Sequence, residues 1–323
     1  MSPLGVEPPA ALSGVAADLT QTIGETPLVQ LSHLSPNPDV RILAKLESAN
    51  PTGSIKDRTA LSLIEDAERR GQISPGDTII EPTSGNTGIS MAMICKVRGY
   101  KLVAVMPDNV SEERRQLLRL FGAEIVESAG QYGSNGSVSL ARELSEERGV
   151  FMPFQYGNPA NPEAHYEGTA AEIVRDCPEI DVFVAGLGTG GTLMGASRRM
   201  KEFNPEIEVV AVEPLQGDSV SGLRSLDDGF IPPILDLEQL DRKLLVTNYD
   251  SIVMTRRLSE EEGIFAGVSS GGIFHVCARL AGEMESGTIV GIVCDGGWKY
   301  LSTGIWSDDI DDVEERLDRS LSW

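Results

Sequence analysis

The sequence is poor in the residues that bind metals or form disulfides. The cysteines form no CxxC pair and the histidines are widely separated, at Cys95, Cys177, Cys277 and Cys294 and at His33, His165 and His275. Structural zinc sites and disulfide frameworks need such residues at close spacing. We therefore expect neither of them, and we expect the reducing cytoplasm as the compartment.

Long apolar runs and a targeting segment are also missing. Residues 1–18, MSPLGVEPPAALSGVAAD, have no basic stretch followed by an apolar core, so we expect a loose tail and no signal peptide. The longest apolar runs, such as VFVAGLG, are too short to span a bilayer. These absences predict a soluble protein that is not exported.

Positive charge is scarce as well. There are 27 lysines and arginines against 49 aspartates and glutamates, which gives a formal net charge of −22. Nucleic acid is an unfavourable partner, because its phosphates demand a basic face. An anionic ligand would need a locally positive site on this protein.

What the sequence does contain is a regular alternation of apolar runs and helical patterns. The 323 residues are 41 % hydrophobic, which suits one large or two medium domains. Continuous β-branched runs are typical of buried parallel strands, and the patterns between most of them predict helices. We therefore predict an α/β fold of doubly wound open sheets. The expected strands are residues 42–47, 77–82, 101–107, 123–128, 181–188, 207–214, 243–248 and 288–295.

Three small-residue loops follow strands and open helices. They are EPTSGNTG at 81–88, AGLGTGGT at 185–192 and AGVSSGG at 266–272. In doubly wound folds such loops lie at the carboxyl ends of strands, where backbone N–H groups and helix N-termini bind anions. The presence of three such loops predicts a single site that binds several anionic or polar groups.

The middle loop allows two ligand hypotheses. Its glycines satisfy GxGxxG, and the next strand ends in an acid where a dinucleotide-binding fold places its ribose ligand, so an NAD-dependent dehydrogenase is one hypothesis. The loop also offers hydroxyl groups, which suits a compact phosphate monoester. A tight turn without any ligand is the structural alternative. The residues concerned are Gly186, Gly188, Gly191, Thr192 and Glu213.

Two further stretches carry candidate chemistry. Lys56 lies in NPTGSIKDR, residues 50–58, where a solvated loop lysine and a site lysine are about equally compatible with that stretch alone. EPTSGNTG crowds hydroxyls and an amide around a glycine, which fits either a capped helix start or a carboxylate cradle.

Taken together, these motifs resemble the cysteine synthase family of pyridoxal phosphate enzymes, the fold type II group. NPTGSIKDR, EPTSGNTG, GLGTGGT and GVSSGG occur in the family's order, and TIGETPLVQL and MPDNVSEERRQLLRLFGAEIV resemble it too. The resemblance implies a tryptophan synthase β-like fold and a homodimer. Together with a Pro- and Asn-rich stretch at 151–162, it implies a larger cofactor-binding domain of 1–47 and 157–323 and a smaller mobile substrate domain of 48–156.

The resemblance also implies a role for each matching residue. Lys56 would form the Schiff base with pyridoxal 5′-phosphate, Asn86 would bond the ring hydroxyl oxygen, and Ser269, in preference to Ser270, would face the ring nitrogen. The cofactor phosphate would bind the loop of Gly188, Thr189, Gly190, Gly191 and Thr192. The substrate carboxylate would bind Thr83, Ser84, Thr87 and Gln155.

The residue types fit the implied reaction. A desolvated lysine at a helix start can lose its proton, and the freed Lys56 would then act as general base on the α-proton of the substrate. The β substituent leaves, a sulfur nucleophile adds and cysteine is released. A serine at the ring nitrogen makes the ring a weaker electron sink, which favours elimination. Lys45 is instead expected to snorkel at the sheet edge.

Two stretches resemble the cysteine synthase B branch, the O-phosphoserine sulfhydrylases. Arg224, in VEPLQGDSVSGLRSLDDGFIP, matches the arginine that meets the substrate phosphate, and CDGGWKYLSTG is similar to the same branch. A guanidinium suits phosphate because it donates two parallel hydrogen bonds. The alternative is that Arg224 pairs with Asp227 or Asp228 on its own loop.

Other assignments stay open. O-Acetylserine is the alternative substrate, and the sulfur donor is either sulfide or a thiocarboxylate on a small carrier protein. Cystathionine β-synthase-like and dehydratase-like lyases would share Lys56 and the phosphate loop, but we expect no regulatory domain after residue 305. The acidic C-terminal stretch predicts an amphipathic helix whose end, DRSLSW, would fold over the site by the same resemblance. Its apolar residues are Ile310, Val313, Leu317 and Leu321.

Overall fold

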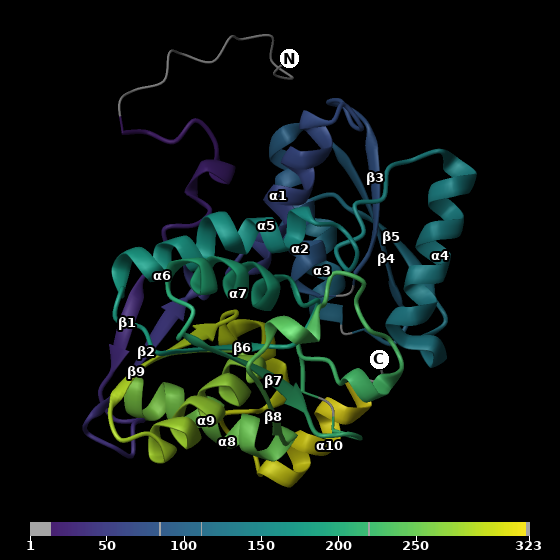
Figure 1. Ribbon diagram of the computed structural model, residues 1–323. Helices are drawn as coiled ribbons and strands as arrows, with labels where there is room; N and C mark the ends of the chain where they lie inside the picture. Colours follow the sequence, from purple (N-terminus) through teal and green to yellow (C-terminus); the bar gives the residue numbers. More distant parts are fainter. Residues whose placement is uncertain (1–13, 84, 111, 219, 321–323) are drawn as a thin grey trace.

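The computed structural model describes residues 14–83, 85–110, 112–218 and 220–320, which fold into two sheets covered by helices (Figure 1). The strands are β1 Leu28–Leu31, β2 Val40–Leu46, β3 Thr78–Pro82, β4 Lys101–Pro107, β5 Glu124–Ser128, β6 Val182–Gly186, β7 Glu208–Pro214, β8 Arg242–Val246 and β9 Gly287–Val293. The α-helices are α1 Lys56–Arg69, α2 Asn86–Arg98, α3 Glu112–Leu120, α4 Gly133–Arg148, α5 Ala160–Ala164, α6 Ala170–Asp176, α7 Gly191–Phe203, α8 Asn248–Glu262, α9 Val268–Glu283 and α10 Ile310–Ser320. Short 3-10 turns occur at Leu19–Thr22, Glu47–Ala49, Gly130–Tyr132, Leu226–Asp228, Leu237–Gln239 and Gly297–Thr303, with a π turn at His165–Thr169.

The two sheets confirm the predicted α/β fold. The larger sheet has the strand order β1-β2-β9-β6-β7-β8, in which β1 is antiparallel to β2 and the other neighbours are parallel. The smaller sheet has three parallel strands in the order β3-β4-β5. Every predicted strand is present within a few residues, whereas the edge strand β1 was not predicted.

Each sheet packs its own hydrophobic core. In the larger sheet β6, β7 and β9 bury almost every side chain, as parallel strands covered on both faces do. In the smaller sheet Ile79 packs toward α1 and α2, while the next residue, Ile80, packs with Ala141 of α4. Alternate side chains therefore serve opposite faces of the sheet. The predicted domain limits, 48–156 against the rest, stay a prediction.

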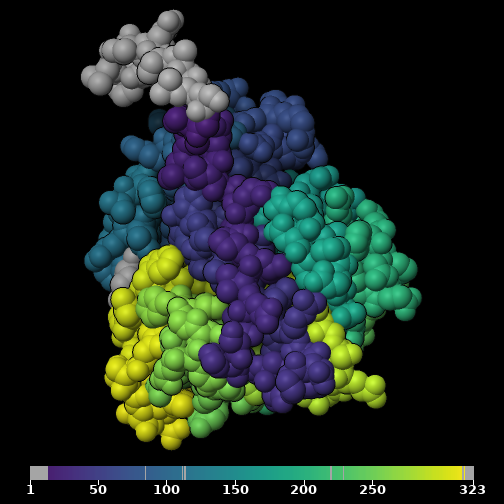
Figure 2. Space-filling view, turned by 90° about the vertical axis from the view of Figure 1, so that its left-hand side faces the viewer, coloured from purple at the N-terminus to yellow at the C-terminus, as the bar shows by residue number. Residues whose placement is uncertain are grey.

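The N-terminal segment runs along one side of the molecule, from the helices of the smaller sheet to those of the larger one (Figure 2). Arg98 of α2 donates to Thr20 Oγ1 at 3.5 Å, and Ser32 N donates to Glu262 of α8 at 3.0 Å. Of the predicted loose tail, residues 1–13 lie outside the described residues. Asp18, at its end, already caps a 3-10 turn through a 2.7 Å hydrogen bond from Thr20 N.

The prediction that Lys45 snorkels at a sheet edge is wrong. Its side chain is fully buried in β2, because β1 forms the edge of the sheet instead. Lys45 Nζ lies 2.7 Å from Glu172 Oε2, and the same carboxylate lies 2.6 Å from Arg58 Nη1. Arg58 also pairs with Glu47 at 2.7 Å. Buried charges need such partners, and this cluster ties the first turn of α1 to both the larger sheet and α6.

The C-terminal helix was correctly predicted as α10. Its Val313 is fully buried, and Arg256 of α8 donates hydrogen bonds to the carbonyls of Ile305 and Asp308 just before it. The side chain of Leu317, and Leu321 itself with the rest of 321–323, lie outside what the structure describes. In the described part of the chain, no helix combines the length and apolarity needed to cross a membrane.

Candidate active site

A cavity of about 620 Å³ lies between the two sheets, at the carboxyl ends of their strands. Its wall includes the last residues of β3, β4, β6 and β7, which are Pro82, Pro107, Gly186 and Pro214. Open α/β sheets bind ligands at this edge, because loops and helix N-termini converge there. The predicted loops indeed meet in this one cavity.

Lys56 is the first residue of α1 and lines the cavity. The turn before it is fixed to the end of β9, since Ile55 N donates to Cys294 O at 2.8 Å and Ser54 bridges to Asp295. Burial lowers the pKa of the Lys56 amine, and the negative charges of nearby Asp295 and Glu47 offset only part of this shift. The amine is therefore easier to deprotonate than a lysine in water.

The β3–α2 connection, the first turn of α2 and Gln155 bring a cluster of hydroxyls and amides to the cavity. Thr83, Asn86, Thr87 and Gln155 all line it, while Ser84 lies outside the described residues. Thr83 Oγ1 accepts a 2.9 Å hydrogen bond from Gly88 N, so it also serves the helix start. Thr87 donates to Gln155 Oε1 at 2.7 Å, which leaves the amide nitrogen of Gln155 as its donor end.

Gln155 is positioned by an unusual turn that the sequence did not reveal. Phe154, just before it, has a left-handed φ of 56°. The N–H groups of Phe154 and Gln155 donate to the two carboxylate oxygens of buried Glu81, at 2.7 and 2.9 Å. The carboxylate of β3 therefore holds a backbone conformation that few residues other than glycine adopt.

The glycine-rich loop between β6 and α7 forms another wall. Gly188, Thr189, Gly190 and Thr192 line the cavity. Gly190 has a φ of 87° and stands at the N-terminus of α7, which favours a residue without Cβ. Gly191 also allows close packing, because a Cβ there would overlap the side chain of Asn161.

The N-terminus of α9 supplies a serine to the cavity floor. Ser269 lines the cavity, and its hydroxyl contacts the Cys294 thiol. Ser270 accepts a 3.0 Å hydrogen bond from Cys294 N and is fully buried. Of the two serines, Ser269 is thus the one that a ligand would meet. Burial raises the pKa of the Cys294 thiol to about 12, so this cysteine stays neutral.

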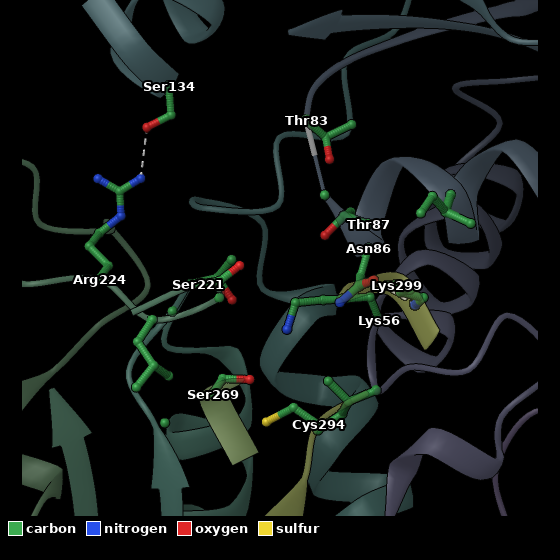
Figure 3. A pocket seen from close by; sticks show the side chains of 18 of the residues that line it. Lys56, Thr83, Asn86, Thr87, Ser134, Ser221, Arg224, Ser269, Cys294 and Lys299 are labelled. Atoms are coloured by element: carbon green, nitrogen blue, oxygen red, sulfur yellow. Dashed lines mark hydrogen bonds between the residues drawn. The ribbon is translucent and has the colours of Figure 1, made fainter. Parts of the chain in front are cut away.

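Arg224 reaches across the upper part of the cavity (Figure 3). Its Nη2 donates to Ser134 Oγ at 3.0 Å, and its guanidinium lies 5.0 Å from the ring centre of Phe230 and 5.5 Å from that of Tyr156. The side-chain acceptor of Arg224 is thus Ser134 rather than Asp227, and the side chain of Asp228 lies outside the described part of the structure.

Two further cations in the cavity were missed. Arg114 of α3 donates to Ser221 Oγ at 3.4 Å, and Lys299 Nζ lies 2.6 Å from Asn86 Oδ1. Both fall in stretches that resemble the cysteine synthases, SEERR and GWKYLSTG, but only the fold brings them to the cavity. Among the described residues that line it, the cations outnumber the single acid Asp218; they are Lys56, Arg114, Arg224 and Lys299. A protein of charge −22 thus has a positive cavity.

This donor set fits pyridoxal phosphate better than a dinucleotide. The glycine-rich loop offers N–H and hydroxyl donors for a phosphate, Lys56 offers an amine of lowered pKa for an aldehyde, and Asn86 and Ser269 offer groups for a polar ring. Glu213, the expected ribose ligand, is buried and forms a 2.6 Å ion pair with Lys243. The residues around the cavity therefore do not support the dehydrogenase hypothesis.

Comparisons with known proteins agree with this donor set. The family described as pyridoxal-phosphate dependent enzyme matches residues 19–295. The cysteine synthase of Staphylococcus aureus is 45 % identical over 302 residues, covering 90 % of this chain and 97 % of that protein. The cysteine synthase B of Pseudomonas aeruginosa is 43 % identical over 290 residues, covering 89 % and 97 %.

Solved structures show the same likeness in three dimensions. An O-acetyl serine sulfhydrylase, isoform 3 from Entamoeba histolytica, aligns with a TM-score of 0.85 at 34 % identity, covering 98 % of this chain and 99 % of that one. An O-ureido-L-serine synthase aligns with a TM-score of 0.87 at 40 % identity, covering 90 % and 95 %. The similarity thus extends over both sheets of the fold.

Proposed function

The chain belongs to the cysteine synthase family of pyridoxal-phosphate-dependent enzymes, and from that premise we propose that it makes L-cysteine from O-phosphoserine by β-replacement. The cofactor and the general reaction follow from the family. The choice of activated serine rests on one observation, which is Arg224 in the cavity wall with its guanidinium held by neutral groups.

We assign the cofactor to the groups that line the lower cavity. Lys56 would hold its aldehyde carbon, Asn86 its ring oxygen and Ser269 its ring nitrogen. The phosphate would bind the loop of Gly188, Thr189, Gly190, Gly191 and Thr192, in which Gly191 also packs against Asn161. Bound there, pyridoxal phosphate supplies an electron sink that weakens the bonds at the substrate α-carbon. The neutral Ser269 hydroxyl would limit the strength of that sink.

Lys56 has the second role of moving a proton. Because its pKa is lowered, the Lys56 amine is more readily neutral, and Nζ would then accept the α-proton of a substrate bound in the cavity. Thr83, Thr87 and Gln155, joined by Ser84 on the same loop, would meanwhile bind the substrate carboxylate and fix the α-carbon near Nζ. Holding the α-carbon close to Lys56 Nζ in this way would make the proton transfer efficient.

Arg224 is the residue that favours O-phosphoserine over O-acetylserine. A dianionic phosphate needs charge-assisted donors, and a guanidinium supplies two in parallel. Its present acceptor, the Ser134 hydroxyl, is neutral and lies at the edge of the cavity, so a phosphate can replace it at little cost. A neutral acetyl ester gains no comparable interaction, although O-acetylserine remains the second candidate because the Entamoeba relative is named for it.

Several finer points are part of the proposal. The sulfur donor is sulfide or a thiocarboxylate on a carrier protein, the enzyme is a cytoplasmic homodimer, and the smaller domain of 48–156 moves to close the cavity. The buried ion pairs of Arg58 with Glu47 and Glu172 tie α1 to the larger domain, so we expect the closing motion to keep these pairs.

The test is a comparison of the two activated serines on the same purified enzyme. With sulfide as donor, kcat/KM for O-phosphoserine is expected to exceed that for O-acetylserine by at least tenfold, and the visible absorption of the bound cofactor should change faster with O-phosphoserine. A higher kcat/KM for O-acetylserine would keep the family and overturn the substrate. Assays with a carrier protein that ends in a thiocarboxylate, run in parallel with sulfide, would show which sulfur donor the enzyme uses.

A further inference from the structure

The side-chain amide of Asn86 is held from both sides. Lys299 Nζ donates to its oxygen, Oδ1, at 2.6 Å, and its nitrogen, Nδ2, donates to Asp295 Oδ2 at 2.7 Å. Asn86 is the first residue of α2, which follows β3 of the smaller sheet, whereas both partners follow β9 of the larger sheet. Figure 3 shows Lys299 and Asn86 side by side, next to Lys56.

These two partners permit only one orientation of the amide. A carboxylate accepts hydrogen bonds and cannot donate them, so the group that faces Asp295 must be the NH₂ end. The ammonium of Lys299 can only donate, so the group that faces it must be the oxygen. A flipped amide would face donor to donor and acceptor to acceptor, and would lose both interactions.

The partners themselves are fixed by the fold. Tyr300 donates a 3.0 Å hydrogen bond to Asp295 Oδ2, and both residues are buried. Lys299 Nζ also lies 3.5 Å from Gly53 O, in the turn that leads to Lys56. Burial lowers the pKa of the Lys299 amine, and nearby Asp295 and Asp57 oppose that shift. One neutral amide thus bonds two charged groups, the half-buried Lys299 and the buried Asp295.

We propose that Lys299 and Asp295 are positioning residues that make Asn86 present an N–H donor to the cofactor. Nδ2 carries two hydrogens, of which Asp295 takes one, so the second is left for the cavity that Asn86 lines. The ring oxygen of the cofactor would then face the remaining N–H of Asn86 Nδ2, which is a donor, and not the amide oxygen, which is an acceptor. This inference rests on the proposed role of Asn86 toward the cofactor ring oxygen.

A double-mutant cycle on the holoenzyme tests the proposal. Four proteins are compared: wild type, Lys299→Met, Asn86→Ala, and the double variant. The readouts are the rate at which the holoenzyme loses pyridoxal phosphate during dialysis and the visible absorption maximum of the bound cofactor. Lys299→Met and Asn86→Ala are each expected to speed cofactor loss about tenfold and to shift the maximum in the same direction. The double variant should match Asn86→Ala alone.

Conservative and remote variants complete the design. Lys299→Arg keeps a donor near Oδ1 and should restore most of the wild-type retention, while Lys96→Met, an exposed change on α2, should leave both readouts unchanged. If Lys299→Met does not fold, Asp295→Asn takes its place in the cycle, because an asparagine there can offer a donor to Nδ2 and no longer enforces its orientation.

The outcomes separate the positioning role of Lys299 from the role of Asn86 itself. If the effects of Lys299→Met and Asn86→Ala multiply in the double variant, Lys299 acts on its own and the positioning role is overturned. The positioning role is also overturned if Lys299→Met leaves both readouts at wild-type values. If Asn86→Ala itself changes neither readout, the failure lies in the proposed role of Asn86.

Discussion

Arg224 and Ser134 join opposite sides of the cavity through a 3.0 Å hydrogen bond. Arg224 follows β7 of the larger sheet, and Ser134 lies in the first turn of α4, beside the smaller sheet. Arg114 of α3 reaches the other way, to Ser221 at 3.4 Å. Two arginines thus cross the mouth in opposite directions, each with a neutral hydroxyl as acceptor. A substrate anion would offer both arginines a charged hydrogen-bond acceptor, which is stronger than a neutral hydroxyl.

The first prediction concerns the side chain of Arg224. Arg224→Ala should lower kcat/KM for O-phosphoserine by about 10- to 100-fold, since a hydrogen bond to a charged group contributes about 1.5–3 kcal/mol. It should change kcat/KM for O-acetylserine much less and leave cofactor retention intact. Steady-state kinetics with both substrates and the absorption spectrum of the variant provide the measurement.

A matched control exists in Arg142. Its guanidinium also lies on an aromatic ring, 4.8 Å from the centre of Phe154, but it does not line the cavity. Arg142→Ala should therefore leave the preference between the substrates unchanged. Equal losses for both substrates in Arg224→Ala would contradict the assignment of O-phosphoserine.

A second prediction concerns the bond between Lys56 and the cofactor. Borohydride reduction should add the mass of the reduced cofactor to the wild-type chain, and peptide mapping should place it at Lys56. Lys56→Ala should take up no covalent label and lose turnover by several orders of magnitude, because both the covalent attachment and the base are removed. Lys299→Ala, a second cavity lysine, serves as control and should still be labelled at Lys56. Label on Lys299 in the wild type would refute the assignment.

A third prediction tests the packing behind the phosphate loop. Asn161 donates to Thr189 Oγ1 at 3.0 Å and to Gln155 O at 2.8 Å, so it links two walls of the cavity. In Gly191→Ala the new methyl group would overlap Asn161 and push it aside. We expect a loss of about 1–3 kcal/mol in the free energy of unfolding, typical of overpacking, together with faster cofactor loss.

The control for this change is another helical glycine. Gly282, near the end of α9, has only Pro36 at an ordinary contact distance from a Cβ. Gly282→Ala should be neutral or slightly stabilising, because alanine favours a helix over glycine. Urea unfolding compares the variants. If Gly191→Ala is as stable as Gly282→Ala, Asn161 is free to move and the packing argument fails.

The parts of the fold that the sequence predicted share one physical property. Strands such as β4, expected and found at residues 101–107, are apolar and buried after their first residue because helices cover both of their faces. The loops were predictable because several runs of glycines and hydroxyl residues each follow a strand and open a helix, the place where open α/β sheets bind ligands. The edge strand β1 lacks this signal, since two of its side chains are exposed and only Leu31 is buried.

The missed residues depend on partners that are distant in the sequence. In the sequence, Lys45 looks like an ordinary lysine on a strand. Its buried ion pair exists only because the fold places Glu172 of α6 beside it. Arg114 and Lys299 lie in stretches that resemble the family, yet their place in the cavity follows from the packing of α3 and of the segment after β9. A local pattern carries no information on which of many charged residues will face a ligand.

The last prediction concerns Glu81, the buried carboxylate behind the Phe154 turn. Burial raises its pKa to about 7, although the N–H groups of Gln155 and Phe154 act in the opposite direction. Because the folded-state pKa lies above the unfolded value of about 4.5, the folded state holds a proton that the unfolded state releases. The contribution of Glu81 to stability is therefore fully present below pH 4.5 and is lost as the pH rises to about 7.

The loss should amount to about 3 kcal/mol between these two pH values, at about 1.4 kcal/mol for each pKa unit. Glutamine does not titrate, so subtracting the unfolding free energy of Glu81→Gln from that of wild type isolates this carboxyl group. Urea unfolding of both proteins with saturating pyridoxal phosphate, from pH 4.5 to 8, gives the difference. It should decline up to about pH 7 and then level off. A difference that stays constant over this range would mean that the two N–H donors keep Glu81 ionised, and the carboxylate would then support the turn equally at every pH.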